Sequence, residues 1–517
     1  MKLILKLLAF VAATMSFSAV SCSKPEDGGG EARLSIVTPD ASVAYGQGSV
    51  TVEFICSGDW TAALEFEGGL DPWAAISGET AGSGSGALQV NVSENAGETA
   101  RTARLTVVSG DLRDDITIVQ EGKRMEITFT HPSLLFTREQ LDKIKAAGDA
   151  GVPSVRKTLD FILIRAGNAL SYNPDQVTTE QKRTNDDMEL LYKYANGPAC
   201  QNIYLLIASV VDEERKEDYL TKAVEVMYSW AAALQDVEYP VSADENHAGA
   251  GMYLARAMFP YFVTYEYVKN TDYITADQRA VVEKWFRSIV DDIKAGITLW
   301  ENNDYFRKQY WQNHLAAHMW GILSIGYALD DPSLVQFAID SPDNPRDFRE
   351  LIQGCVFMEG DTPCSRENPG SPAVRTGEIY DRYRHDTGPM KGLQYSALTL
   401  QILSSAARTC FNNGIDMYAY TAPTGENLRL AYEFYSDFYV TGDCSINGGY
   451  YSGEEDRLGI AGDAIGLFEL GYNAYPDSEK IKAVIDAIPD RGANADSNMN
   501  DQLGYLRLYS IDADAVN

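Results

Sequence analysis

Residues 310–329 read YWQNHLAAHMWGILSIGYAL, a pattern that predicts one buried helix. Its apolar side chains recur at steps of three and four residues, and the sequence DDP at 330–332 ends the pattern. Asn313 and His314 make the first turn polar, at the end of the helix where unpaired backbone N–H groups and the helix dipole favour an anion. We therefore expect a sugar carboxylate to bind at this end.

His314 and His318 stand four residues apart, which is also the spacing of a zinc-binding pair. Leu315 occupies the position where the metalloprotease motif requires a glutamate, and no third ligand follows. We therefore predict no metal site and no other cofactor. His318 has two interpretations, a hydrogen-bonded core residue or a group that contacts a ligand.

The chain has 517 residues and a net charge of −31, without runs of lysine or arginine. Its length predicts two or three domains, and its hydrophobic content of 45% supports a large core. The lack of clustered basic side chains argues against nucleic acid as a partner. An anionic ligand is still possible, because the local field within a site decides its affinity. We expect a monomer.

The chain opens with lysines and a short apolar run, too short to span a bilayer and typical of an export signal. The residues before Cys22 resemble a bacterial lipoprotein signal. We predict a signal peptide at 1–21, a lipid on Cys22 and a flexible tether at 22–33. The acidic pair in the tether resembles surface-export signals of Bacteroidota lipoproteins, so we expect the outer membrane, facing outward, with membrane contact only through the lipid.

The other six cysteines are widely scattered and show no metal-binding spacing. In an exported protein Cys355 and Cys364 can form a disulfide. Buried free thiols are the alternative, and the sequence leaves both open.

Residues 34–122 have a β pattern, because apolar and polar side chains alternate between turns rich in Gly, Ser and Asp. The segment resembles a BACON module, a small immunoglobulin-like domain of Bacteroidota surface enzymes. The matching pieces are GDW at 58–60, GETAR at 97–101 and ITIVQ at 116–120. Trp60 and Trp73 can stack on a sugar, but a tryptophan within a strand pattern is usually core, so a spacer role is favoured.

Residues 123–517 change to a helical pattern without a fixed-period repeat. Paired helices of this number, joined by aromatic-rich loops, predict a mainly α fold, an α/α toroid that follows the small β-sandwich. The predicted helices are at 138–147, 155–170, 187–211, 219–234, 248–268, 276–297, 311–329, 389–412, 428–438, 458–472 and 478–488.

Residues 361–389 form a long segment with few helical signals and many polar side chains, a combination that is usually functional. The helix that follows is predicted to begin at Pro389. Arg384 and His385 precede this helix, and Tyr395 lies about two turns inside it. If Tyr395 faces the axis of the ring, these side chains converge on the polar end of the helix at 311–329.

Each of these residues also has an ordinary interpretation. The arginines can pair with Glu378 and Asp381 on a solvated face, and Tyr395 can be one of many core tyrosines among the 30 in the chain. Taken singly, the ordinary interpretation is favoured. Convergence at one place would distinguish the two.

Residues 126–490 resemble the catalytic domain of alginate-lyase-type polysaccharide lyases. The stretches that carry the resemblance are HPSLLFTREQL at 131–141, AGAGMYLARA at 248–257, Asn313-His314 and GLQYSAL at 392–398. The resemblance implies that Asn313 and His314 bind and neutralise a uronate carboxylate, and that Tyr395 shuttles a proton. It also implies that Arg384 is the supporting cation, although its distance in sequence from Tyr395 leaves Arg382 and Tyr383 in competition for this supporting position. His385 is expected to take the place of a histidine that related sequences carry before this helix. Further expected substrate contacts are His318, Arg382, Tyr383, His247, Trp311 and Arg375.

Such enzymes cleave by β-elimination, which removes the proton on C5 of the uronate and expels the oxygen on C4. Groups that neutralise the carboxylate stabilise the developing enolate. A tyrosine can act as the base when neighbouring cations, here Arg384 and a charged His385, favour its phenolate. The expected substrate is alginate, as polymannuronate, or glucuronan, with the endo or exo mode left open.

Two alternatives remain at this stage. A glycoside hydrolase on the same fold needs two carboxylic acids facing one cleft, for which Glu359, Asp361 and Glu378 are candidates. A glycan-binding surface lipoprotein without activity is the other. Elimination differs from both because its product carries a double bond that absorbs ultraviolet light.

Overall fold

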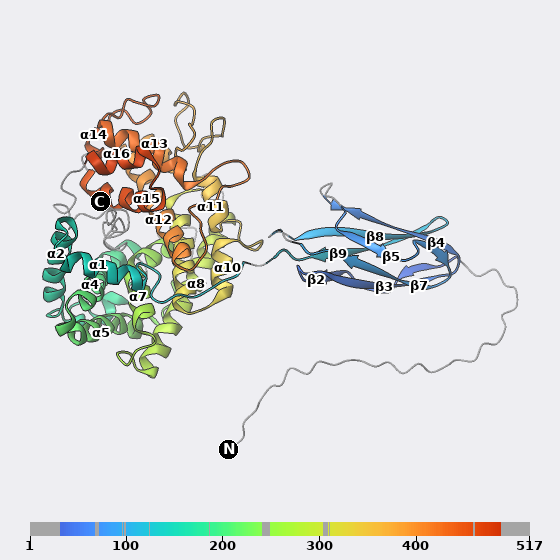
Figure 1. Cartoon of the computed structure of the whole chain (residues 1–517), viewed down its shortest axis with the longest axis horizontal. Helices are drawn as coiled ribbons and strands as arrows, with labels where there is room; N and C mark the ends of the chain where they lie inside the picture. Colours follow the sequence, from blue (N-terminus) through green and yellow to red (C-terminus); the bar gives the residue numbers. More distant parts are fainter. Residues whose placement is uncertain are drawn as a thin grey trace, which may run out of the picture. The chain divides into compact units, whose positions relative to one another are not determined.

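The computed structural model describes residues 32–487 apart from 68–71, 96, 98–99, 124, 186, 240–248, 303–308, 310 and 459–460. The chain divides into two compact units, Met1–Glu126 and Ile127–Asn517 (Figure 1). Cys22, the predicted signal peptide, most of the predicted tether and His247 lie outside the described residues. Among the helices that are described, none combines the length and apolarity needed to cross a bilayer.

The first unit is a β-sandwich whose described sheets have the strand orders β1-β3-β7-β5 and β2-β9-β8-β4-β6. Adjacent strands are antiparallel except β2 and β9, which are parallel. The strands are β1 (Leu34–Ile36), β2 (Ala41–Val43), β3 (Gly48–Cys56), β4 (Asp59–Phe66), β5 (Ala74–Ser77), β6 (Ala81–Ser83), β7 (Gly86–Val92), β8 (Arg101–Ser109) and β9 (Leu112–Gln120).

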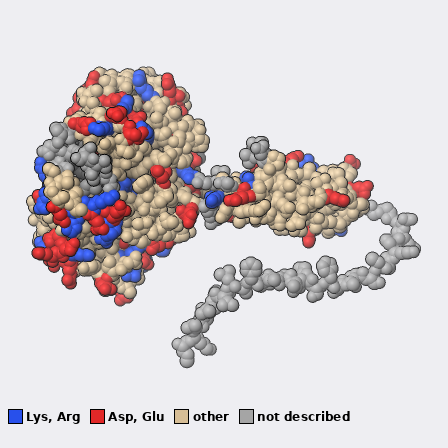
Figure 2. All heavy atoms as spheres, in the orientation of Figure 1, with Lys and Arg blue, Asp and Glu red and all other residues tan. Residues whose placement is uncertain are grey.

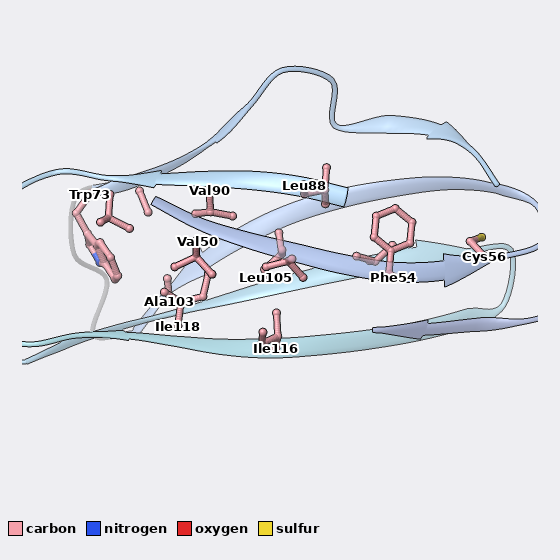
Figure 3. Close-up of a cluster of buried hydrophobic side chains, with 14 residues drawn as sticks. Val50, Phe54, Cys56, Trp73, Leu88, Val90, Ala103, Leu105, Ile116 and Ile118 are labelled. Atoms are coloured by element: carbon pink, nitrogen blue, oxygen red, sulfur yellow. The ribbon is translucent and has the colours of Figure 1, made fainter. Parts of the chain in front are cut away.

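The sandwich core lies between the two sheets (Figure 3). Alternate residues of β3, including Val50, Val52 and Phe54, are buried, as the period of two predicts. Trp73 is 5% exposed and Trp60 packs against the same core, with its ring 4.9 Å from that of Phe54. Both tryptophans therefore serve the core, and the structure gives no support to sugar stacking on them.

The second unit is helical, as the sequence predicts. Its α-helices are α1 (Arg138–Asp149), α2 (Pro153–Ala169), α3 (Thr179–Lys182), α4 (Met188–Val211), α5 (Lys216–Leu234), α7 (Ala250–Val268), α8 (Ala276–Asn302), α9 (Asn313–Ala328), α10 (Pro332–Ile339), α11 (Phe348–Cys355), α12 (Gly392–Asn412), α13 (Leu428–Thr441), α14 (Glu455–Leu458), α15 (Ala461–Ala474) and α16 (Glu479–Ala487). Short 3-10 helices are η2 (Pro174–Gln176), η3 (Glu213–Arg215) and η5 (Tyr380–His385).

The helices form two rows around an incomplete α/α toroid. In one row α4 packs on α7, α7 on α9, α9 on α12 and α12 on α15. The second row packs against the first through the pairs α2–α4, α5–α4, α8–α7, α10–α9, α13–α12 and α16–α15. On the visible face of this unit, acidic and basic side chains are interspersed (Figure 2).

Small residues bring α7 and α9 close together. A Cβ atom on Gly251 would lie 2.8 Å from His318 Nε2, and one on Gly321 would lie 2.7 Å from the Cβ of Ala255. Gly251 precedes Ala255 on α7, and their respective neighbours on α9, His318 and Gly321, follow in the same order. The two helices therefore run in the same direction. Their amino ends therefore lie on the same side of the ring.

Several predicted helix starts differ from the structure by two or three residues, and two of these lie next to the candidate site residues. The helix predicted from Pro389 begins at Gly392, where Glu454 accepts the backbone N–H groups of Gly392 and Leu393, each at 2.8 Å. The helix predicted from 311 begins at Asn313. The short helices α10 and α11 were not predicted.

Candidate active site

The amino end of α9 already holds a carboxylate, which belongs to Asp381 of η5. The backbone N–H of Asn313 donates to Asp381 Oδ2 at 2.8 Å, and the Asn313 amide nitrogen donates to Asp381 Oδ1 at 3.2 Å. Asp381 is 0% exposed and Asn313 is 2% exposed. The anion expected at this helix end is therefore supplied by the chain itself, and a substrate would have to use the side chains around it.

Asp381 also joins this end of α9 to α12, which carries Tyr395. Thr399 Oγ1 donates to Asp381 Oδ2 at 2.6 Å, and Thr399 is fully buried one turn after Tyr395. Burial raises the pKa of Asp381, while the charge of Arg384 and the hydrogen bonds from Thr399 and Asn313 oppose that shift.

Arg384 connects the same groups to the phenol. Its Nη2 donates to the side-chain oxygen of Gln312 at 3.1 Å, and its Nε lies 3.7 Å from Asp381 Oδ1. Its guanidinium carbon is 4.8 Å from the centre of the Tyr395 ring, and Tyr395 is half-buried. A guanidinium over the ring face is a favourable cation–π arrangement and also stabilises negative charge near the phenol. Asn313, Arg384 and Tyr395 are thus brought together.

His314 follows Asn313 and packs near Trp300, with ring centres 5.5 Å apart. Burial, followed by the positive charge of Arg384, holds the pKa of His314 well below its usual range, and Arg256 acts in the same direction. His314 is therefore neutral at pH 7. It can donate or accept a hydrogen bond, but in this structure it carries no charge with which to neutralise a carboxylate.

His318 lies one turn deeper, is 0% exposed and packs against Gly251. Among the described residues, neither of its ring nitrogens has a hydrogen-bond partner, and burial lowers the pKa of His318 to about 3. The interpretation of His318 as a core residue is therefore confirmed, but the hydrogen bond expected for it is not found among the described residues. Because the His318 side chain is fully buried, it has no exposed surface with which to contact a substrate.

His385 contacts Glu454 and two tyrosines in the segment before α14. Its Nδ1 lies 2.7 Å from Glu454 Oε1, and its ring packs against Tyr450 and Tyr451. Glu454 is the carboxylate at the start of α12, so His385 helps to fix the beginning of the helix that carries Tyr395.

Arg382 and Tyr383 are both 0% exposed. The Arg382 guanidinium is paired with Glu378 and, at 3.1 Å, with Glu367, while the Tyr383 hydroxyl donates to Gln309 at 3.1 Å. These placements argue against the predicted substrate contacts and leave Arg384 as the better supporting cation. Arg375 is exposed, and its guanidinium lies beside Gly448.

Trp311 lines a cavity of about 710 Å³. Its ring packs against Gly354 on α11 and lies 4.0 Å from the guanidinium carbon of Arg346. The cavity is also lined by the carboxylates of Glu350, Asp361 and Glu426. Because these charges repel a uronate, the cavity does not suit the substrate contact predicted for Trp311.

Sequence reasoning missed a group of residues on α4 and α7. Arg256 lies over the Tyr192 ring at 5.4 Å, and the rings of Tyr192 and Tyr253 are 5.9 Å apart. Burial raises the pKa of Tyr253, with smaller contributions that include one from Tyr395. Arg256 and Tyr253 lie in the AGAGMYLARA stretch, which carried the resemblance and was the available signal.

The described residues contain no group of three or more His, Cys, Asp or Glu side chains placed to hold a metal ion. The six cysteines in the described residues are buried free thiols, Cys355 and Cys364 included, which agrees with the second of the two alternatives.

Residues 166–443, more than half of the chain, match the alginate lyase family. The chain belongs to this family. It is therefore a polysaccharide lyase, and the hydrolase alternative loses its support. Residues 67–121 match the BACON family, described as a putative binding domain, N-terminal. Among curated proteins there is no match.

Two solved structures are similar to this chain to different degrees. An alginate lyase from Bacteroides ovatus is 13% identical, with a TM-score of 0.50 over 70% of this chain and 97% of that chain. The alginate lyase A1-III from Sphingomonas species A1 is 14% identical, with a TM-score of 0.38 over 56% of this chain and 70% of that chain. The likeness to the Bacteroides enzyme agrees with the toroid described above.

The positions of the three carboxylic acids considered for hydrolysis can also be compared with that of Asn313. Glu378 is 1% exposed and paired with Arg382, while Glu359 and Asp361 are exposed. The carboxylic acids named for hydrolysis therefore do not converge with the residues around Asn313.

Proposed function

We propose that this lyase cleaves a uronate-containing polysaccharide, alginate or glucuronan, by β-elimination. The observation that carries the proposal is the position of Arg384, which bonds to Gln312 beside Asn313 and lies over Tyr395. The start of α9 and the segment that carries Arg384, which are about 70 residues apart in the sequence, are thereby brought together. An amide, a neutral imidazole, a guanidinium and a phenol are the groups that this elimination needs.

In the proposed reaction, the substrate carboxylate accepts hydrogen bonds from Asn313 and His314, and Arg384 supplies the positive charge. The phenolate of Tyr395 removes the proton on C5, and the resulting enolate is stabilised by the same donors. As the double bond forms between C4 and C5, the bond from C4 to the glycosidic oxygen breaks. With mannuronate, Tyr395 then returns its proton to the departing oxygen, which restores the phenolate.

The test is incubation of the purified protein with polymannuronate, polyguluronate and glucuronan, followed by ultraviolet absorbance of unsaturated chain ends. Tyr395→Phe removes the group that accepts and returns the proton, so kcat should fall by at least about 100-fold. Tyr327→Phe is the matched control, because this hydroxyl lies near the opposite end of α9 and has no hydrogen-bond partner among the described residues. Full activity of Tyr395→Phe would remove Tyr395 from the mechanism.

Export and lipid attachment at Cys22, with the protein on the outer membrane facing outward, are also proposed. The support is the sequence of residues 1–30 alone. A monomer and an anionic polysaccharide partner complete the proposal.

A further inference from the structure

We infer that Asp381 is a positioning residue for the elimination, because its carboxylate sets the orientation of the Asn313 amide and holds Arg384 beside Tyr395. The inference rests on the proposed function and adds a residue that the sequence assigned only to a solvated ion pair. Asp381 would not touch the substrate. It would act through Asn313, Arg384 and Thr399.

The first step concerns the Asn313 amide. An ionised carboxylate only accepts hydrogen bonds, so the amide nitrogen of Asn313 and not its oxygen must face Asp381. One N–H of that nitrogen reaches Asp381 Oδ1 at 3.2 Å, and no contact among the described residues uses the second N–H. Asp381 thereby leaves a donor for the substrate carboxylate. A neutral group in place of this carboxylate would hold the amide less firmly, so the donor would be less well oriented as the enolate forms.

The second step concerns the backbone at the start of α9. Asn313 N–H donates to Asp381 Oδ2 at 2.8 Å, so the backbone and the side chain of one residue are both attached to one carboxylate. Two contacts to a single rigid group restrict the χ angles of Asn313 more strongly than either contact would alone. Hydrogen bonds to an ionised acceptor are also the shorter and stronger kind.

The third step concerns Arg384 and α12. Asp381 Oδ1 lies 3.7 Å from Arg384 Nε, and Thr399 Oγ1 lies 2.6 Å from Asp381 Oδ2 and 3.1 Å from the Tyr395 carbonyl oxygen. Asp381 therefore contacts the cation and the helical turn of the proposed base. A displacement of about 1 Å between reacting groups can cost about 100-fold in rate, which makes such a shared support matter for kcat.

The burial of Asp381 explains why the site tolerates a negative charge where an anionic substrate binds. The carboxylate is 0% exposed and is surrounded by a helix amino end, a guanidinium and a hydroxyl. These groups offset its charge inside the protein. Removing the charge should therefore weaken positioning without weakening substrate binding.

The test is Asp381→Asn, which is nearly isosteric, assayed on the polymer that the unaltered protein cleaves best. We expect kcat to fall by about 10- to 100-fold, with KM unchanged or lower because a negative charge has been removed. A role in stability alone would lower the thermal midpoint and leave kcat and KM of the folded protein as they were.

Glu378→Gln is the matched control, because Glu378 is another buried carboxylate on the same segment but pairs with Arg382. It should lower the thermal midpoint and leave the kcat of the folded protein unchanged. If Asp381→Asn lacks the helical circular dichroism of the unaltered protein, Thr399→Val provides the same test, with an expected fall of a few-fold in kcat at constant KM.

The outcomes separate the inference from the proposed function. Failure of the unaltered protein to make unsaturated ends from any uronate polymer overturns both. Cleavage by the unaltered protein together with an unchanged kcat in Asp381→Asn, or in Thr399→Val where that variant is used, overturns the inference alone. A rise in KM with kcat unchanged overturns it as well, because that result assigns Asp381 to substrate binding.

Discussion

The burial of His318 makes the stability of the helical unit depend on pH. Burial lowers the pKa of His318 from 6.5 to about 3, so the native state does not take up the proton that the unfolded state gains below pH 6.5. His318 therefore contributes its full stabilisation above pH 6.5, and this contribution to the free energy of unfolding is lost as the pH falls toward 3. At pH 5 the loss is about 2 kcal/mol, and at pH 3 it is about 4 kcal/mol.

His318→Leu isolates this contribution. The substitution keeps a similar volume and removes two buried nitrogens for which the described part of the chain offers no hydrogen-bond partner, so little change is expected at pH 8. Between pH 8 and pH 5, the free energy of unfolding should fall by about 2 kcal/mol less in the variant than in the unaltered protein. His314 and His131 are present in both proteins, so their own titrations cancel in the comparison.

Urea unfolding followed by helical circular dichroism is the appropriate assay, because the α-helices named in the described residues all belong to the second unit. The two proteins are compared at pH 8 and pH 5 with the same buffer ions. Equal losses of unfolding free energy in both would show that His318 takes up its proton in the native state, which would refute the argument from burial.

Two further predictions concern packing and pH. Gly354→Ala places a methyl group against the face of the Trp311 ring, so the thermal midpoint should fall by an amount equivalent to about 1–3 kcal/mol, and an unchanged midpoint would mean that the ring can move aside. Burial works to lower the pKa of His131, but the hydrogen bond and charge of Glu266 outweigh it, and the pKa is raised overall. The contribution of His131 to stability is therefore complete below its unfolded pKa and lost as the pH rises through its folded pKa. His131→Gln should lower the free energy of unfolding more at pH 6 than at pH 9, and an equal loss at both values would contradict this.

The long helices and the sandwich strands were predictable because their signals are local. The period-two alternation of β3 and the helical spacing along residues 310–329 each place apolar side chains on one face, and burial of that face is the main stabilising contribution wherever the segment packs. The helix amino end at Asn313 was likewise identified as an anion site from local properties alone.

The occupant of that anion site was not predictable from local signals. Asp381 and Arg384 belong to a segment that sequence analysis treated as either a solvated face or a converging site. The structure shows that Arg382 pairs with Glu378 inside the protein, while Arg384 reaches the start of α9. These neighbouring arginines have the same chemistry, and only the direction of each side chain within η5 separates their roles.

The sequence by itself therefore determined the long helices and the long sandwich strands, where the β pattern gives way to the helical one, and which residue types suit a uronate. The tertiary structure decided that Asp381 occupies the end of α9, that Glu454 sets the start of α12, and that His318 is buried with no hydrogen-bond partner in the part of the chain that the structure describes. The physical reason is the sequence separation over which each kind of interaction acts. Periodicity and propensity act between residues a few positions apart, whereas a buried charge is satisfied by groups that chain folding brings from about 60 to 70 positions away.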